Sequence, residues 1–167
     1  MGLLDGIATA TGNSTSIYLG GGRHLIRVTE LYFRDTDDNP ELAGTFRLNG
    51  ELVKTNNAKH SEHVGNVVTA NISFKEPKLR KDNLARMRRI LTKVLSSQRG
   101  ETVTEDQAAA EAVKCVGPSQ PCVGTYVVIL GTEKFSKTRK NDDGSPGVYT
   151  LYEAAVPTDE DIEGLGE

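Results

Sequence analysis

"VVTANISFKEPKLRKDNLARMRRILTKVLSS", residues 67–97, decides the fold because its hydrophobic period changes part-way along. Over residues 67–74 apolar side chains alternate with polar ones, which is typical of a strand with one buried face. Over residues 82–97 apolar side chains recur every three or four positions, which indicates an amphipathic helix with Asp82 as its expected N-cap. The sequence therefore predicts a strand followed closely by a helix.

Further strand patterns lie on both sides of this stretch. Residues 24–33 and 45–53 precede it and are separated by a loop rich in Asp and Pro. Residues 123–135 and 148–156 follow it, and the first of these runs is apolar on both faces, which predicts a central strand. The order is three strands, a helical middle and two strands.

A second, shorter helix is expected over residues 104–114. Thr104 and Gln107 have the spacing of a capping box, and an Ala-rich run follows them. The predicted fold is mainly β: a five-stranded barrel of the OB-fold type, with the amphipathic helix and the short helix between strands three and four. Its domain would span residues 20–156, after a flexible N-terminal segment (1–19) and before a disordered acidic tail (157–167).

Charge is distributed unevenly along the chain. The whole sequence has 20 basic and 23 acidic residues, and removing the five acids of the tail from the 23 leaves 18 acids in residues 1–156. The tail has no Lys or Arg, and its acids are Asp159, Glu160, Asp161, Glu163 and Glu167. A mildly basic body with an acidic tail is typical of nucleic-acid-binding chains and of interaction tails, and the alternative is a tail that serves solubility alone.

Four segments together resemble the single-stranded-DNA-binding proteins of bacteriophages: "GGRHLIRVTELYF", "HVGNVVTANISF", "CVGTYVVILGTEKFSKT" and "YTLYEAAVP". The resemblance covers about residues 20–156 and is one of pattern. It implies an OB-fold that holds single-stranded DNA without sequence preference. It also implies an acidic tail that contacts replication or recombination proteins and a location in the cytoplasm of an infected bacterium. Assembly into a homo-oligomer is compatible with the resemblance.

Binding single strands without reading sequence requires cations that follow phosphates and aromatic rings on which bases stack. The densest combination lies at the tip of the last hairpin, residues 134–140. The predicted nucleic-acid-binding residues are Arg27, Arg47, Lys54, Lys59, Lys75, Lys78, Arg80, Lys81, Lys134, Phe135, Lys137, Arg139, Lys140, Tyr149 and Tyr152. Phe46, Phe74 and Tyr126 alternate with core positions and are assigned to the core. Alternatively, a lysine-rich tip only protects a sheet edge.

Other classes of site receive little support. Cys115 and Cys122 flank a Gly/Pro turn and, with His60 and His63, do not have zinc-site spacing, so no metal or cofactor is predicted. No motif of an enzyme nucleophile, P-loop or metalloprotease is present, so we expect no catalysis. The sequence also lacks a secretory signal and a long apolar run, which predicts a cytoplasmic protein. The alternative function is a phage structural or assembly protein with a β-rich fold and no nucleic-acid role.

Overall fold

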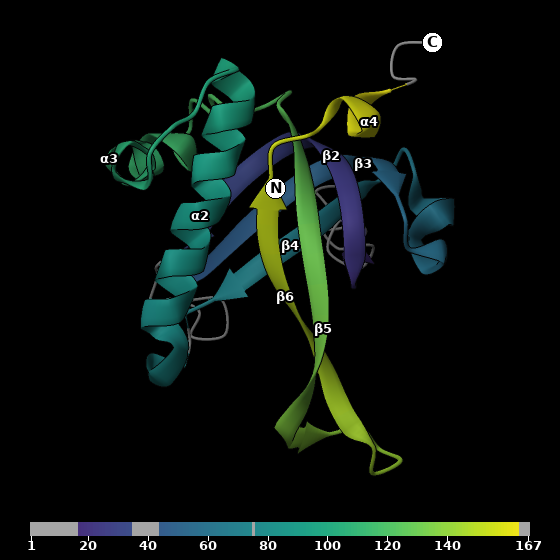
Figure 1. The fold of residues 1–167 in the computed structure, drawn as a ribbon. Coiled ribbons are helices and arrows are strands. Elements are labelled where there is room, and N and C mark those ends of the chain that lie inside the picture. Colours follow the sequence, from purple (N-terminus) through teal and green to yellow (C-terminus); the bar gives the residue numbers. More distant parts are fainter. Residues whose placement is uncertain (1–16, 35–43, 75, 164–167) are drawn as a thin grey trace, which may run out of the picture.

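Strands and one long helix occupy the positions that the hydrophobic pattern predicts (Figure 1). The computed structural model describes residues 17–34, 44–74 and 76–163. Its strands are β1 (Ile17–Tyr18), β2 (Gly22–Arg34), β3 (Thr45–Thr55), β4 (Val67–Ser73), β5 (Tyr126–Lys140) and β6 (Pro146–Ala155). Its helices are α2 (Arg80–Arg99), α3 (Glu105–Cys115) and α4 (Asp159–Ile162), with short 3-10 turns η1 (Ala58–His63) and η2 (Pro77–Leu79). The fold is mainly β, as predicted.

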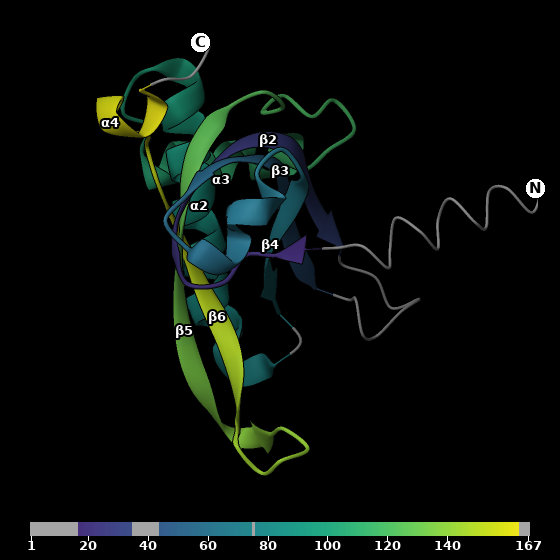
Figure 2. The same cartoon turned by 90° about the vertical axis from the view of Figure 1, so that its right-hand side faces the viewer.

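The strands of the described residues form one sheet in the order β1-β4-β3-β2-β5-β6. Neighbouring strands are antiparallel, except that β1 runs parallel to β4 with Ile17 opposite Val68. The sheet curls into a half-barrel (Figures 1 and 2). Its outermost strands β1 and β6 are close where the Tyr152 hydroxyl of β6 bonds to the carbonyl of Leu19, the residue after β1. Five strands were predicted, and the sixth is β1, which is too short to show an alternating pattern.

The core lies between the curled sheet and α2. Strands β2 to β4 contribute buried residues such as Ile26, Leu48 and Val68, and α2 contributes Val94 and Leu95. Helix α2 packs against β4, β5 and β6. Strand β5 lies between β2 and β6, and its residues 127–129 are fully buried, so the predicted central strand is confirmed.

Both helices between β4 and β5 are present, but α2 begins earlier than predicted. Its N-cap is Leu79, which makes no side-chain capping bond, and Asp82 lies inside the first turn. The prediction of Asp82 as N-cap is therefore wrong. Its carboxylate instead stabilises the helix by interacting with the positive end of the helix dipole. For α3 the capping box of Thr104 and Gln107 is confirmed.

Ile17 and Tyr18 belong to the sheet and Leu19 to the core, although the sequence placed 1–19 outside the domain. Leu19 is only 1% exposed and is part of the core. A two-residue strand next to a glycine triplet gives no periodic signal, which explains the difference. Residues 1–16 lie outside the described residues.

Leu19 and Gly20 form a latch between the two edges of the sheet, which we call the Gly20 latch. The Leu19 N–H donates to the Thr69 carbonyl of β4 at 2.9 Å, and the Tyr152 hydroxyl of β6 donates to the Leu19 carbonyl. The backbone of β5 also approaches closely, since a Cβ built on Gly131 would lie 2.1 Å from the Gly20 oxygen. Only glycine at position 131 permits this approach.

Two histidines bind the peptide groups of Gly20. The Gly20 N–H donates to His60 Nε2 at 2.9 Å, and His24 Nε2, which faces the Gly20 carbonyl at 2.9 Å, must donate to it. His24 is fully buried, and its Nδ1 lies 2.8 Å from the Thr55 hydroxyl. Burial lowers the pKa of both histidines, so both are neutral at neutral pH.

Within the described residues, no helix is both long enough and apolar enough to cross a membrane.

Substituting Gly131 with Ala tests the close approach of β5 to the latch. The new methyl group would overlap the Gly20 carbonyl, and the backbones would have to separate. We expect the free energy of unfolding to fall by about 1–3 kcal/mol, measured by urea denaturation. Gly21→Ala is the matched control, because its Cβ would make only ordinary van der Waals contacts, the nearest with the Glu133 side chain at 3.4 Å. Equal effects of the two substitutions would contradict this account.

The histidine bonds predict that stability depends on pH. A group whose pKa is lower in the folded protein stabilises the fold above its unfolded pKa, and this contribution is lost as the pH falls. We therefore expect the free energy of unfolding to decrease as the pH falls below about 6.5, the ordinary histidine pKa. His60→Gln, which keeps an acceptor for the Gly20 N–H but does not titrate, should reduce this slope in urea titrations. An unchanged slope would show that His60 does not couple the latch to pH.

Candidate nucleic-acid interface

A groove of about 630 Å³ follows the seam between β4 and β6, and we call it the seam groove. It lies beside the Gly20 latch, because the latch residues bridge the same two sheet edges. The described residues that line it are Tyr18, Leu19, Gly20, Asn71, Ile72, Ser73, Leu79, Asn83, Arg86, Arg139, Val148, Tyr149, Thr150, Leu151 and Tyr152. They include two arginines and no Asp or Glu, so the groove favours an anionic ligand.

Two aromatic rings are accessible on opposite sides of the seam groove. Tyr18 of β1 is 47% exposed, and Tyr149 of β6 is 43% exposed. Each ring therefore presents part of its surface to solvent while the rest is supported by the protein. Rings held in this way can stack on unpaired bases.

The two arginines of the groove are held by different partners. Arg86 of α2 is mostly buried, and its Nε lies 3.5 Å from Glu153, whose carboxylate also binds Arg89 at 2.6 Å. Two guanidinium groups thus share one carboxylate, which leaves excess positive charge at this wall. Arg139 donates to the Val148 carbonyl at 3.0 Å and lies over Gly147, where a Cβ would be 2.9 Å from Arg139 Nε.

The predicted hairpin cluster lies on what we call the hairpin arm, residues 134–149, which projects beyond the rest of the sheet (Figures 1 and 2). Lys134 pairs with Tyr149 across the two strands, and Phe135, 72% exposed, pairs with Val148. Lys137 and Lys140 are exposed along the same arm. The structure thus brings the hairpin residues together at one end of the seam groove, through Arg139 and Tyr149.

The outer face of the sheet contains two further predicted cations. Arg27 is exposed and pairs with Glu51 at 3.1 Å, and this carboxylate offsets the positive charge of the arginine. Arg47 is half-buried in a cross-strand row between Tyr32 and Asn71, and its Nε has no hydrogen-bond partner. Because Asn71 lines the seam groove, Arg47 lies one strand away from it.

The remaining predicted cations lie elsewhere. The Lys54 side chain reaches the acidic segment and donates to the Glu160 carbonyl at 3.2 Å. Lys59 is exposed in η1. Lys78, Arg80 and Lys81 lie around the beginning of α2, where Arg80 donates to the Phe74 carbonyl at 3.1 Å. None of these five lines the seam groove. Lys75 lies outside the described residues.

The assignments of Tyr152 and Tyr126 need correction. Tyr152 is only 4% exposed, its hydroxyl donates to the Leu19 carbonyl, and burial raises its pKa to about 12. It is a core and latch residue and has no surface on which a base could stack. Tyr126, assigned to the core from its phase, is 39% exposed, whereas Phe46 and Phe74 are buried as expected.

Sequence reasoning missed three residues of these surfaces. Tyr18 gave no signal because β1 is so short, and Arg86 lies on a helix whose pattern predicts only that one of its faces is apolar. Arg23 was overlooked because it precedes the alternating part of its strand. A search for aromatic residues next to glycine runs would have found Tyr18.

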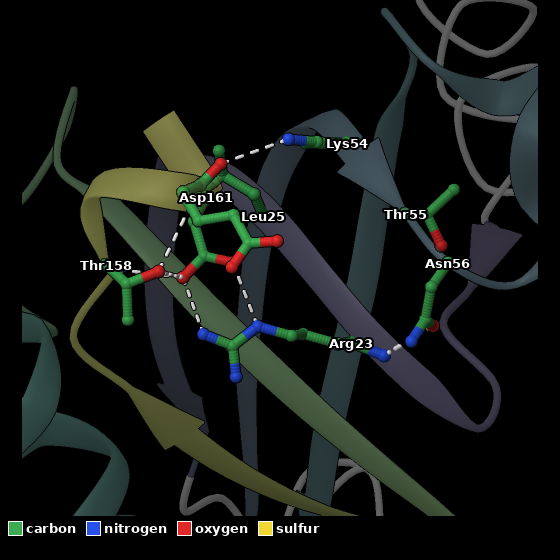
Figure 3. Close-up of a pocket in the computed structure, with 8 residues that line it drawn as sticks. Arg23, Leu25, Lys54, Thr55, Asn56, Thr158 and Asp161 are labelled. Atoms are coloured by element: carbon green, nitrogen blue, oxygen red, sulfur yellow. Dashed lines mark hydrogen bonds and ion pairs between the residues drawn. The ribbon is translucent and has the colours of Figure 1, made fainter. Parts of the chain in front are cut away.

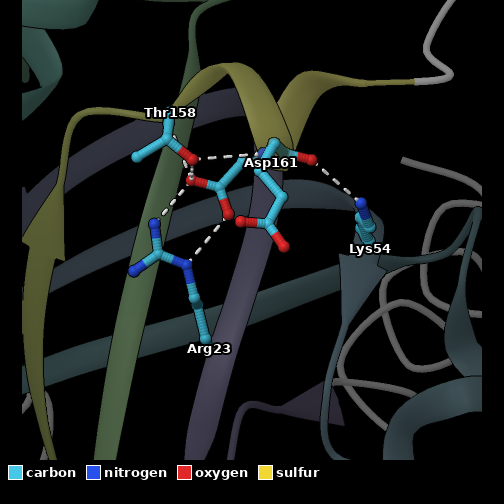
Figure 4. Close-up of polar contacts among 5 residues, drawn as sticks. Arg23, Lys54, Thr158 and Asp161 are labelled. Carbon is cyan, nitrogen blue, oxygen red and sulfur yellow. Dashed lines mark hydrogen bonds and ion pairs between the residues drawn. The ribbon is translucent and has the colours of Figure 1, made fainter.

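The acidic segment, residues 157–167, differs from the prediction of a tail free of the domain. Its described part forms α4, with Thr158 and Asp161 in a capping box, and docks on β2 and β3 (Figure 3). Asp161 binds Arg23 through two bonds, of 2.9 and 2.5 Å, and this guanidinium lowers the pKa of the carboxyl well below its usual range (Figure 4). The composition of the segment shows its negative charge, but it does not show that Thr158 caps a helix or that Asp161 binds Arg23. Glu167 lies outside the described residues.

Among the described residues, no group of three or more His, Cys, Asp or Glu side chains could hold a metal ion. His60 and His63 belong to the latch region, and their rings are 6.0 Å apart. Cys115 and Cys122 are buried with their sulfurs 4.0 Å apart, and the hydrogen bond between the thiols raises the pKa of Cys122. The thiols therefore pack beneath the turn that follows α3.

No family model matches this sequence, and no curated protein matches it.

Proposed function

We propose that the protein binds single-stranded DNA without sequence specificity through the seam groove and the hairpin arm. The observation that carries the proposal is the lining of the groove: two half-exposed tyrosines, two arginines and no carboxylate among the described residues. Phosphates would contact Arg86 and Arg139, and unpaired bases would stack on Tyr18 and Tyr149. The exposed lysines and Phe135 would extend this surface along the arm.

Single strands are favoured over duplex because stacking on a tyrosine requires a base that is free of its partner. Stacking and charge, which do not depend on base identity, would dominate binding. Such binding weakens steeply as salt rises, because each phosphate contact releases counterions.

We interpret β2 to β6 as the five strands of an OB-fold, with β1 added at the edge. The supporting features are the β2-β3-β4 meander, the pairing of β2 with β5, and the helices between β4 and β5. OB-folds bind oligonucleotides on the face of their second and third strands and on the loop between the last two. These elements correspond to β3, β4 and the hairpin arm. The resemblance to phage single-stranded-DNA-binding proteins suggests a role in replication or recombination.

We further propose that the acidic segment competes with DNA and, when displaced, contacts partner proteins. Asp161 neutralises Arg23, and the Glu160 carbonyl binds Lys54, beside a pocket of about 380 Å³ (Figures 3 and 4). A DNA phosphate that reached this pocket would compete for the same two cations. Its negative charge would then favour release of α4.

Fluorescence anisotropy with labelled oligo-dT and a matching duplex tests the main proposal. We expect tighter binding of oligo-dT at low salt and a steep loss of affinity as salt rises. Tyr149→Ala should weaken binding about tenfold or more, since stacking contributes about 1–3 kcal/mol per base.

Tyr126→Ala is the matched control, because Tyr126 is similarly exposed but does not line the groove. Its affinity should equal that of the wild type. Equal or absent binding of oligo-dT and duplex at low salt would refute the proposal and favour a structural or assembly role. Equal effects of the two tyrosine substitutions would show that the seam groove is not the DNA-binding site.

The competing role of the acidic segment predicts tighter DNA binding when its contact is lost. We expect Asp161→Asn to strengthen oligo-dT binding at low salt by about two- to fivefold, the effect of one partly exposed ion pair. Truncation after Val156 should have a larger effect, and all variants should converge as salt screens the competition. Glu101→Gln removes one exposed charge elsewhere and should change nothing. Unchanged affinity of the truncated chain at every salt concentration would leave the segment with a solubility role.

A further inference from the structure

A second groove, of about 770 Å³, lies between α2 and α3, and we call it the α2–α3 groove. Its apolar lining residues are Leu84, Ala85, Met87, Leu91, Ala109 and Ala112. Leu84, Met87 and Leu91 follow one another at helical spacing, which normally marks a face buried against the domain. Leu91 is buried, but Leu84 is 51% exposed. The described residues therefore leave the apolar face of α2 partly uncovered at Leu84, near the beginning of the helix.

The short length of α3 explains this exposure. Helix α3 has 11 residues against 20 in α2, so it can cover only part of its neighbour. The uncovered part is bordered by cations: Arg80, Lys81 and Arg88 line the groove, and no Asp or Glu is among its described lining residues. Arg88 has one acidic neighbour, Glu105 at 3.4 Å. An apolar floor with a cationic border fits an acidic peptide that has apolar anchors.

We propose that the acidic segment of a second copy of this chain docks in the α2–α3 groove. The segment has five carboxylates and no Lys or Arg, which complements the three cations. Ile162 and Leu165 are the large apolar residues of this segment. Ile162 is 43% exposed on α4 and is not part of its own domain's core. It is available as an anchor for another surface.

The position of α4 agrees with a contact between copies. Within one chain, α4 docks on Arg23 and Lys54 and lies toward the opposite end of the molecule from the beginning of α2 (Figures 1 and 2). A second copy can supply the segment without this constraint.

A fluorescein-labelled peptide of residues 156–167 titrated with the full-length chain tests the proposal by anisotropy. We expect binding at low salt that weakens at least tenfold in Leu84→Glu, which places a like charge in the groove. Val113→Glu is the matched control, because Val113 is 83% exposed on α3 and does not line the groove. A peptide with Ile162→Ser and Leu165→Ser keeps every charge and should bind at least tenfold more weakly.

Lys81→Glu gives an independent variant, because Lys81 is exposed and its replacement should not disturb folding. It should also weaken peptide binding. Sedimentation velocity of the full-length chain should show concentration-dependent self-association that Leu84→Glu abolishes and Val113→Glu retains. Absent peptide binding at low salt, or equal binding by Leu84→Glu and Val113→Glu, would overturn the proposal. So would loss of oligo-dT binding by Leu84→Glu without peptide binding, which would assign the groove to nucleic acid.

Discussion

The Gly20 latch is the interaction on which the shape of the molecule depends. A curled sheet whose outer strands are not hydrogen-bonded to each other would leave two open edges, which tend to pair with other chains. Here the peptide groups of Leu19 and Gly20 bond to Thr69 of β4, to Tyr152 of β6 and to two histidines. Glycine at position 131 lets β5 approach. These contacts hold the two edges at a fixed separation without merging them into a closed barrel.

That separation creates the seam groove and determines which side chains line it. Tyr18 lines the groove because it belongs to β1. Tyr149 lines it because β6 turns Tyr152 into the core and leaves Tyr149 exposed. The long helix supplies Arg86, and the hairpin arm supplies Arg139. The cations and rings proposed to bind DNA therefore come from three parts of the chain that are distant in sequence, β1, α2 and the β5–β6 hairpin, and the latch fixes their relative positions.

Periodicity was sufficient for the strands from β2 to β6 and for both helices between β4 and β5, because each has enough residues to repeat its pattern. It failed for β1, whose two residues are held by contacts from distant segments. The candidate site divides in the same way. The hairpin cluster around Phe135 is local in sequence and could be predicted as a cluster, whereas the presence of Tyr18 and Tyr149 in one groove depends on tertiary structure. Tyr152 shows that aromatic composition cannot separate a stacking ring from a core ring until the strand's phase is fixed.

The central claim is that single-stranded DNA lies along the seam between β4 and β6. Photocrosslinking of the full-length chain to an oligonucleotide containing 5-bromodeoxyuridine, followed by mass spectrometry of the crosslinked peptides, tests it most directly. The account predicts crosslinks to Tyr18 and Tyr149, with Phe135 as a further contact on the hairpin arm. Crosslinks confined to peptides of α2 and α3, or spread evenly over exposed residues such as Tyr126, would contradict it.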